Sequence, residues 1–317
     1  MSDILFIKTS SLGDVIHQMP ALTEARRRRA DARVSWVVEE AFAPLVRLHP
    51  GVDDVVEIAQ RRWRSTAFMP STWTEVGRFM GMLRWRNYDE IVDTQGLFFK
   101  SGVIARLARG RRHGYDADSI RDPAASWCYD VRHKVGRDLH AIARNRLLTG
   151  LALGYAPDGA IDFGLDRGKL AASPDNAYGI LLHATARPEK EWPEAWWIAL
   201  AQRLEARGTT VLLPWGSDTE QARSNRIAAA LGRAQVPEKQ PLDHMARLIA
   251  GASFVIGVDT GLLHLAAALG VPLVAIFVGS VPGLTGPMGQ GPIAVVGGKG
   301  EVPEVADVLD ALARLPT

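Results

Sequence analysis

Three short segments of this chain combine residue types that can do chemistry. The first, residues 8–14 (KTSSLGD), follows an apolar run and ends on the carboxylate of Asp14. Its small residues, Ser10 and Gly13 among them, let a substrate approach the backbone closely. A carboxylate at a helix start is a preferred N-cap, and it is also a candidate general base. The helix dipole keeps such a group ionised but weakens it as a base, so both roles stay open for Asp14.

The second segment, residues 183–193 (HATARPEKEWP), carries a hydroxyl at Thr185 and an ammonium at Lys190. A loop of this kind before a helix suits a diphosphate, because both groups donate to phosphate oxygens. A solvated lysine is the alternative for Lys190. We interpret Trp192 and Pro193 as structural residues at the start of the next helix.

The third segment, residues 258–264 (VDTGLLH), follows another apolar strand. Thr260 and Gly261 would present backbone N–H groups at a helix start, which is a natural anion site. Asp259 either accepts hydrogen bonds from sugar hydroxyls or caps the helix, and His264 lies one turn beyond Thr260. Glu220 follows a separate strand end, LPWG at 213–216, where a carboxylate either accepts from a ribose or stabilises the helix start.

A dense basic cluster, RRWR at 61–64, stands apart from these segments. Arginine forks bind phosphates and carboxylates with two parallel hydrogen bonds, so the cluster is a candidate anion site. Lys100 and His140 are candidates for the same surface. Asp116 and Asp118 resemble a metal-binding D-x-D pair, but their polar loop has no clear strand context and we interpret them as structural.

Alternating strands and helices must position these segments. In the first half we predict strands at 4–7, 34–38, 55–58 and 90–93 and helices at 14–29, 40–48, 73–86, 98–108 and 138–152. In the second half we predict strands at 178–183, 210–214, 254–257 and 273–277 and helices at 194–207, 218–231, 243–250, 261–269 and 303–314. This alternation predicts an α/β fold with parallel sheets covered on both faces, joined by residues 155–176. Ligands bind at the carboxyl ends of such strands.

Length and composition exclude several classes of protein. The 317 residues fit two domains, and 47% apolar with 23% charged residues is ordinary globular composition. One cysteine, Cys128, excludes a disulfide framework and a multi-thiolate metal site. The longest apolar stretch is too short for a membrane span, and the N-terminus lacks the features of a secretory signal. We therefore expect a soluble cytoplasmic protein.

Charge is unevenly distributed along the chain. Residues 1–150 carry 24 Lys and Arg against 18 Asp and Glu, whereas residues 151–317 carry 13 against 17. A basic first half indicates an anionic partner such as nucleic acid, phosphorylated lipid or a membrane surface. Solvated helix faces, with residues 26–29 as the clearest example, are the alternative.

The segments occur together in a specific order: KTSSLGD, RRWR, HATARPEKEW, LPWG and VDTGLLHL. This ordered set resembles the bacterial lipopolysaccharide heptosyltransferases, glycosyltransferase family 9, over nearly the whole chain. The resemblance implies a GT-B fold, with two facing Rossmann-like domains and the active site in the cleft between them. We expect an N-terminal acceptor-binding domain at 1–160 and a C-terminal nucleotide-sugar-binding domain at 161–317.

The resemblance also implies an activity. It is inverting, metal-independent and cofactor-free transfer of L-glycero-D-manno-heptose from ADP-L-glycero-β-D-manno-heptose to a Kdo residue of Kdo2-lipid A. The protein would work at the cytoplasmic face of the inner membrane, attached peripherally to that anionic surface. We expect a monomer that binds no nucleic acid.

Site roles follow from the resemblance residue by residue. The catalytic residues are expected to be Asp14, as the base, and Lys190, which would stabilise the leaving diphosphate. Donor-binding residues are expected at Thr185, Ala186, Lys190, Glu220, Gln240, Asp259, Thr260, Gly261 and His264. Acceptor-binding residues are expected at Ser10, Gly13, Arg61, Arg62, Arg64, Lys100 and His140, and no metal ligand is expected.

The chain departs from the family pattern at two points. The family often has a second hydroxyl where Ala186 stands, so only the backbone N–H can serve there. The family's G-P-T-D-P turn reads GSVP at 279–282, so any role of its aspartate is lost or moved. Three alternatives remain: a related transferase with another acceptor, such as heptosyltransferase II; a nicotinamide dehydrogenase, against which the missing G-x-G-x-x-G counts; and a non-catalytic two-domain nucleotide-sugar-binding protein.

Overall fold

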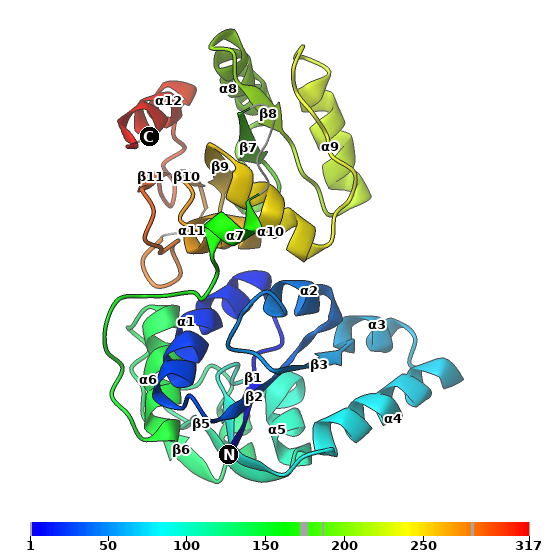
Figure 1. The fold of residues 1–317 in the computed structure, drawn as a ribbon. Helices are drawn as coiled ribbons and strands as arrows, with labels where there is room; N and C mark the ends of the chain where they lie inside the picture. The colour runs from blue at the N-terminus through cyan, green and yellow to red at the C-terminus, as the bar shows by residue number, and fades with distance from the viewer. Residues whose placement is uncertain (1, 172–176, 186, 280–281, 317) are drawn as a thin grey trace. The chain divides into compact units, whose positions relative to one another are not determined.

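A computed structural model describes residues 2–171, 177–185, 187–279 and 282–316 of the chain. The chain divides into two compact units, residues 1–164 (unit 1) and residues 165–317 (unit 2) (Figure 1). Each unit is built around its own parallel β-sheet. The α/β class predicted from the alternating apolar runs is confirmed.

Unit 1 contains a six-stranded parallel sheet in the order β3-β2-β1-β4-β5-β6. The strands are β1 (Asp3–Ile7), β2 (Arg33–Glu39), β3 (Asp54–Ile58), β4 (Tyr88–Asp93), β5 (Gly110–Tyr115) and β6 (Val131–His133). Central strand β1 pairs with β2 and β4, and its residues Leu5, Phe6 and Ile7 are fully buried. A strand that is buried on both faces needs a continuous apolar run, which is what this sequence supplies.

Helices cover the sheet of unit 1. They are α1 (Leu12–Arg28), α2 (Ala43–Val46), α3 (Gln60–Ser65), α4 (Pro70–Arg84), α5 (Val103–Leu107) and α6 (Ala141–Leu153), with shorter turns η1 (Glu40–Phe42), η2 (Phe98–Gly102) and η3 (Pro123–Cys128). Helices α1 and α6 pack side by side (Figure 1). Helix α6 ends at Gly154, whose φ of 77° is a left-handed conformation that glycine adopts without strain.

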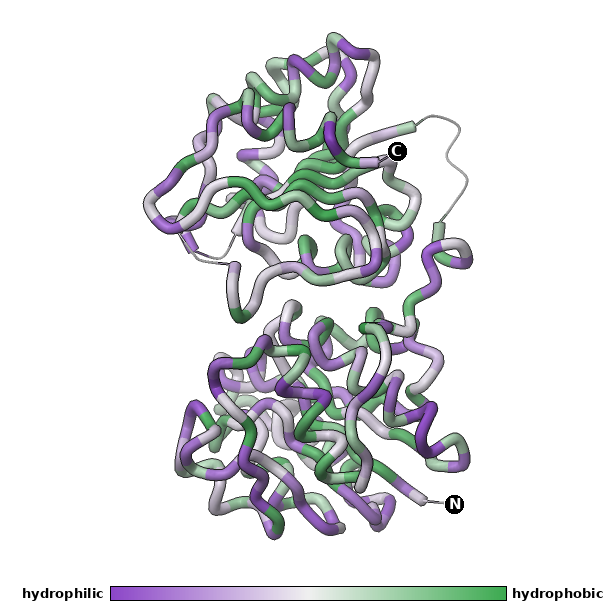
Figure 2. Tube along the Cα trace, turned by 90° about the vertical axis from the view of Figure 1, so that its left-hand side faces the viewer, coloured by the Kyte–Doolittle hydropathy of each residue, from purple (hydrophilic) through white to green (hydrophobic). Residues whose placement is uncertain are grey.

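Unit 2 contains a five-stranded parallel sheet in the order β11-β10-β9-β7-β8. The strands are β7 (Tyr178–Leu182), β8 (Thr210–Leu212), β9 (Phe254–Val258), β10 (Leu273–Phe277) and β11 (Ile293–Gly297). The helices are α7 (Arg167–Leu170), α8 (Glu194–Ala206), α9 (Asp218–Ala228), α10 (Leu242–Gly251), α11 (Gly261–Ala268) and α12 (Val305–Arg314), with a short turn η4 (Pro188–Lys190). Figure 2 shows hydrophobic residues gathered along the strands.

Two tryptophans anchor the core of unit 2. Trp192 and Trp197 are fully buried, and their rings meet edge to face with centroids 4.9 Å apart. The indole N–H of Trp192 donates to the carbonyl oxygen of Pro303 at 2.8 Å, so the buried polar atom is satisfied. The structural role predicted for Trp192 is thus confirmed, and this anchor fixes the loop in which Lys190 lies.

Several predicted elements differ from those observed. Strands β5, β6 and β11 were not predicted; β5 reads GRRHGY, so its pattern is charged rather than apolar. The predicted helix at 98–108 is a π-helical turn followed by α5, and the predicted helix at 40–48 is η1 followed by α2. The cluster at 61–64 forms part of a helix, α3. Within the described ranges no helix is both long and apolar enough to cross a membrane.

Candidate active site

Both sheets have a point at which the strand order reverses. In unit 1 it lies between β1 and β4, and in unit 2 between β7 and β9. Loops leave these paired strands in opposite directions, which opens a crevice at their carboxyl ends where α/β proteins bind ligands. Residues 8–14 follow β1, and the segments 183–193 and 258–264 follow β7 and β9. The three candidate segments therefore lie at the two switch points.

Asp14 occupies the first turn of α1. Its Oδ2 accepts hydrogen bonds from the backbone N–H of Ser11 at 2.8 Å and from the Ser11 hydroxyl at 2.9 Å. The helix begins with a capping box, because the Ser11 side chain in turn accepts from the backbone of Asp14. Both bonds that Asp14 accepts use one carboxylate oxygen. The helix-start role predicted for Asp14 is confirmed, although at the third helical position rather than at the N-cap; its role as a base stays a prediction.

Two buried charges lie beneath this turn. The ammonium of Lys8 donates to the carbonyl oxygen of Thr94 at 2.8 Å. Burial lowers the pKa of Lys8, while the negative charges of Asp14 and Asp93 act in the opposite direction. Burial raises the pKa of Asp93, whose Oδ2 accepts from the Tyr129 hydroxyl at 2.7 Å. These charges make the β1–β4 switch point a polar site inside an apolar sheet.

Sequence reasoning missed Asp93 and its neighbours. The Asp93 Oδ1 accepts from the backbone N–H groups of Gln95 and Gly96, at 2.9 and 3.2 Å, and so shapes the loop after β4. The Gln95 side chain then accepts from the backbone N–H of Ser10 at 3.2 Å. The available signal was a carboxylate directly after the apolar pair Ile91 and Val92, at the end of a predicted strand.

Three further acceptor candidates of unit 1 lie in the segments that follow β1, β4 and β6. Gly13 is in the first turn of α1. Lys100 lies in η2, where its carbonyl oxygen accepts from the Gln60 side chain at 3.1 Å. His140 caps α6: its Nδ1 accepts from the backbone N–H of Ile142 at 3.2 Å, and its ring contacts the ring of His17 edge to face. All three follow the carboxyl ends of strands of the same sheet.

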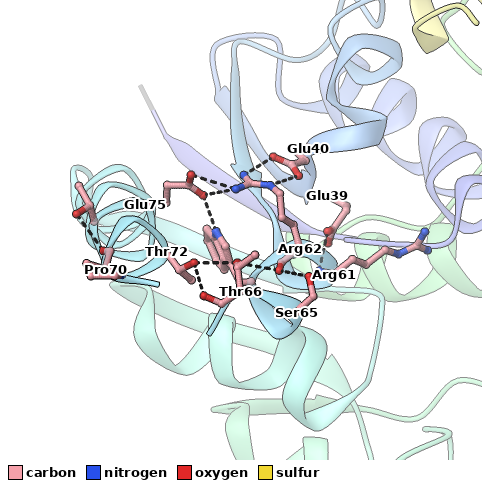
Figure 3. Close-up of polar contacts among 11 residues, drawn as sticks. Glu39, Glu40, Arg61, Arg62, Ser65, Thr66, Pro70, Thr72 and Glu75 are labelled. Carbon is pink, nitrogen blue, oxygen red and sulfur yellow. Dashed lines mark hydrogen bonds and ion pairs between the residues drawn. The ribbon is translucent and has the colours of Figure 1, made fainter. Parts of the chain in front are cut away.

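The arginines of α3 have different environments (Figure 3). The Arg62 guanidinium donates to Glu40 at 2.8 and 3.0 Å and pairs with Glu75 at 2.8 Å, and these carboxylates raise the pKa of Arg62. Figure 3 shows Arg61 leaving the helix in another direction. Its guanidinium lies 5.6 Å from the centroid of the Phe42 ring. Arg62 therefore braces α3 in this structure, whereas Arg61 and the exposed Arg64 form no ion pair with any described residue.

In unit 2 the loops after β7 and β9 are joined by side-chain contacts. The Thr185 hydroxyl donates to the carbonyl oxygen of Asp259 at 3.1 Å, and the Lys190 ammonium forms an ion pair with the Asp259 carboxylate. His264 Nε2 lies 4.0 Å from Asp259 Oδ1. Four predicted donor-binding residues thus form one cluster, although the two segments that carry them, one after β7 and one after β9, are 69 to 74 positions apart.

Helix α11 begins beside this cluster. Thr260 is its N-cap and Gly261 its first residue. The first N–H groups of a helix have no intrahelical partner and carry the positive end of the dipole, so they bind anions. An ammonium, a hydroxyl and a helix start converge here, which is a donor set suited to a diphosphate.

A cavity of about 440 Å³ lies between the Ala184–Thr185 loop, the start of α8 and the start of α9. Glu220 lines it, and its Oε2 accepts from the backbone N–H of Gly216 at 2.7 Å. Arg223 also lines it; its guanidinium pairs with Glu191 at 2.8 Å and donates to the carbonyl oxygen of Trp192 at 2.7 Å. Arg223, which sequence reasoning missed, therefore fixes the segment next to Lys190 against α9.

For two of the predicted donor-binding residues, Gln240 and Ala186, the structure gives no side-chain contact. Gln240 is half-buried just before α10, and no hydrogen bond of its side chain is found among the described residues. Ala186 lies outside the described residues, as do two positions of the variant turn, 280 and 281. Glu220 has the helix-start contact that was its alternative role, and a contact with a ribose stays a prediction.

The sequence pattern that defines glycosyltransferase family 9 (heptosyltransferase) matches residues 76–309, which is most of the chain. The chain belongs to this family. A curated family member from Pseudomonas aeruginosa, lipopolysaccharide heptosyltransferase 1, is 43% identical over 90% of this chain and 81% of its own length. The predicted resemblance is confirmed, and the chain is a glycosyltransferase, which decides against the dehydrogenase and non-catalytic alternatives.

Solved structures of family 9 members share the fold. E. coli heptosyltransferase WaaC with ADP aligns with a TM-score of 0.91 at 36% identity, covering 98% of this chain and 99% of that one. The same enzyme with ADP-2-deoxy-2-fluoro heptose aligns with a TM-score of 0.87, again at 36% identity and 98% coverage of both chains. The GT-B type predicted for this family 9 chain is confirmed by this similarity.

Proposed function

We propose that this chain transfers heptose from ADP-heptose to a Kdo residue of Kdo2-lipid A, with inversion and without a metal ion. The observation that carries the proposal is the cluster of Thr185, Lys190 and Asp259 beside the start of α11. Similarity to a transferase solved with ADP and with a fluorinated ADP-heptose supports the choice of donor. The name of the curated relative from Pseudomonas aeruginosa, lipopolysaccharide heptosyltransferase 1, supports a role in lipopolysaccharide synthesis.

Unit 2 supplies the donor contacts in this proposal. The Lys190 ammonium, the Thr185 hydroxyl and the N–H groups of Gly261 and its neighbours receive the diphosphate. Lys190 is held by Asp259 before the donor arrives, so its charge is already oriented when the leaving group becomes more negative. Preorganised donors of this kind stabilise charge without reorganisation cost. Glu220 and Gln240 are the proposed contacts for the nucleoside, and His264 and the Ala186 N–H are further donor contacts.

Unit 1 supplies the base. Asp14 takes the proton from the attacking Kdo hydroxyl while the bond from the anomeric carbon to the diphosphate breaks, and ADP leaves from the opposite face. The sugar passes through an oxocarbenium-like transition state, as in glycoside hydrolysis. Because the ammonium of Lys190 and the helix start neutralise the departing diphosphate, no metal is required for that task.

Acceptor binding is assigned to the carboxyl-end loops of unit 1. Arg61 and Arg64 bind the carboxylates of Kdo or the phosphates of lipid A, together with Ser10, Gly13, Lys100 and His140. Arg62 joins them only if it exchanges a carboxylate partner for the ligand, since Glu40 and Glu75 already hold it. The protein then acts as a monomer attached peripherally to the cytoplasmic face of the inner membrane.

Mass spectrometry of the acceptor tests the reaction directly. The protein is incubated with ADP-heptose and Kdo2-lipid A in excess chelator, and the expected product carries one added heptose. A parallel sample starts from an acceptor that already has one heptose, which identifies a second transferase if only that sample reacts. NMR of the anomeric proton reports inversion. Absence of product from both acceptors, or dependence on added metal, contradicts the proposal.

A further inference from the structure

Helix α4 and the turn before it expose an unusual number of large apolar side chains. Phe68 is fully exposed, and Trp73 and Trp85 keep 66% and 79% of their surface in contact with solvent. Met69 and Met82, in the same stretch, are 55% and 47% exposed. Exposed apolar groups that cluster in this way mark an interaction surface rather than ordinary solvent-facing positions.

Helix α4 is amphipathic, because one of its faces is buried and the others are exposed. Thr72, Phe79 and Leu83 are buried at helical spacing and face the unit, with α4 packed beside β3. Trp73 and Met82 lie on the two flanks of the helix, each one position from a buried residue, and Gly77 and Gly81 lie on the outer side between them. A β-carbon added at Gly77 or Gly81 would meet no atom within 4 Å beyond the backbone of the helix itself. The helix thus has one face in the core and one outer face without a partner among the described residues (Figure 1).

Hydrogen bonds hold the start of α4 and the turn before it in place. The Trp73 indole donates to the carbonyl oxygen of Ala67 at 3.0 Å, and the Thr72 hydroxyl donates to the carbonyl oxygen of Thr66 at 2.7 Å. The Trp63 indole donates to Glu75, and its ring meets the ring of Phe79 edge to face. The bonds from Thr72 and Trp73 therefore tie the residues after Phe68 to those before it, so the turn is fixed in place; Figure 3 shows the contact between Thr66 and Thr72.

Positive charge surrounds these side chains. Residues 60–86 contain six arginines and a single acidic residue, Glu75. Arg62 and Arg86 pair with carboxylates, whereas the other four form no ion pair with any described residue: Arg61, Arg64, Arg78 and Arg84. Exposed apolar side chains on a fixed turn and helix, together with unpaired guanidinium groups, complement the surface of an anionic bilayer. Aromatic rings enter the headgroup layer of such a bilayer, and cations contact its phosphates.

We propose that this surface, defined by Phe68, Met69, Trp73, Met82 and Trp85 with Arg64, Arg78 and Arg84, docks unit 1 on an anionic phospholipid bilayer. It deepens the proposed function, since it names the element that attaches the enzyme to the membrane of its lipid-linked acceptor. Phe68 and Trp73 insert between headgroups, and the arginines contact lipid phosphates. Binding should therefore need both anionic lipid and the aromatic side chains.

Co-sedimentation with sucrose-loaded vesicles tests the proposal. The full chain is titrated with vesicles of phosphatidylethanolamine and phosphatidylglycerol, and separately with vesicles of phosphatidylcholine. We expect binding to the first and at least tenfold weaker binding to the second. The variants Phe68→Ser/Trp73→Ser and Arg78→Glu/Arg84→Glu should each lose at least tenfold in affinity for the anionic vesicles.

Matched controls separate this surface from general effects. Trp127→Ala removes an aromatic ring that is 75% exposed elsewhere in unit 1, and Arg203→Glu/Arg207→Glu makes the same charge change in unit 2. Both should bind anionic vesicles within twofold of the unaltered chain. Circular dichroism and thermal unfolding verify that each variant is folded.

Three outcomes overturn the proposal: the unaltered chain binds neither vesicle, the aromatic variant binds as well as the unaltered chain, or the controls lose affinity equally. A dimer in sedimentation velocity that Phe68→Ser/Trp73→Ser abolishes, without vesicle binding, assigns the surface to a second copy instead. The vesicles contain no sugar acceptor, so this result is independent of the transfer assay. Conversely, transfer to a deacylated, water-soluble acceptor should persist in the aromatic variant.

Discussion

Both units contain a doubly wound parallel sheet, but the pairing and burial of their charged side chains differ. At the switch point of unit 2, charges are paired before any ligand binds: Lys190 with Asp259, and Arg223 with Glu191. In unit 1, the charges at the switch point are buried, as for Lys8 and Asp93, and several arginines at the surface are unpaired within the described chain. Unit 2 resembles a preformed receptor for a small anion, whereas unit 1 offers a broad basic and partly apolar surface.

This difference fits two ligands of different kinds. A nucleotide-sugar is small and enters a fixed set of donors, so preorganised contacts give affinity and orientation. A lipid-linked acceptor sits on a membrane, so a broad surface with exposed cations and aromatic rings suits it better. The comparison predicts that substitutions in unit 1 and in unit 2 affect different steps.

The largest effect is expected from Asp14→Asn, which keeps the shape of the side chain but removes the base. We expect kcat to fall about 10²–10⁴-fold, while the Kd for ADP changes little because the proposed donor contacts lie in unit 2. Turnover assays and calorimetry measure the two quantities. Ser11→Ala removes the hydroxyl that caps α1 and donates to Asp14 Oδ2, so it should cost stability, about 1 kcal/mol, and lower kcat far less than Asp14→Asn. Near-normal turnover of Asp14→Asn would show that another group is the base.

Removing the cation of unit 2 should affect both donor affinity and turnover. Lys190→Met is expected to lower kcat about 10²–10³-fold, since an electrostatic donor to the leaving group is lost, and to weaken ADP binding. Part of the loss in affinity comes from removing the ammonium that offsets the negative charge of the Asp259 carboxylate next to the diphosphate. The double variant Lys190→Met/Asp259→Asn should therefore recover part of the ADP affinity but not the turnover. Unchanged ADP affinity in Lys190→Met would remove this residue from the donor site.

Acid is expected to lower the free energy of unfolding of both units, because each unit contains a buried histidine that is neutral when folded. Burial lowers the pKa of His49 in unit 1 and of His183 in unit 2 to about 4. The unfolded chain therefore takes up protons at a higher pH than the folded one, so stability is full above about pH 6.5 and falls between about pH 6.5 and 4. We expect each histidine to cost about 2 kcal/mol of unfolding free energy at about pH 5 relative to pH 7.

The His49 contacts explain this sign. Its Nδ1 accepts from the backbone N–H of Gly51 at 3.0 Å and its Nε2 contacts the Thr23 hydroxyl at 2.9 Å, so a second ring proton would face a donor. Urea unfolding at about pH 5 and pH 7 measures the loss of unfolding free energy. The variants His49→Gln and His183→Asn each remove the contribution of one histidine. A variant that keeps the full acid sensitivity of the parent would exclude that histidine as a source.

The smallest effect is expected from salt, which should weaken binding of the acceptor to unit 1 more than binding of ADP to unit 2. Raising the salt concentration from about 50 mM to about 300 mM shortens the screening length to roughly half, which weakens contacts with exposed arginines most. We expect the KM for a deacylated acceptor to rise severalfold and the Kd for ADP to change less, because Lys190 is partly buried. Equal salt dependence of the two constants would contradict the division of labour between the units.

Much of the site can be predicted from the order of the segments, because loops that follow parallel strands gather at one edge of a sheet. Thr185, Lys190 and Asp259 are identified in this way from the sequence. The contacts of Arg62 could not be predicted, since its partners Glu40 and Glu75 lie 22 and 13 positions away on neighbouring elements. Asp93 was missed because one carboxylate at the end of an apolar strand gives no periodic signal of its own, and Arg223 was missed because it lies among other polar residues of α9.

The sequence by itself determined most of the alternation of strands and helices, although not β5, β6 and β11, and it determined the strand ends at which polar groups occur. Those features are local, since apolar runs and helix-start residues act through neighbours along the chain. Only the tertiary structure decided which charges are cancelled and which remain exposed. Pairing depends on the lateral order of strands, which places Lys8 beside Thr94 and Lys190 beside Asp259 although 86 and 69 positions separate them. Electrostatic interaction falls with distance in space, not along the sequence.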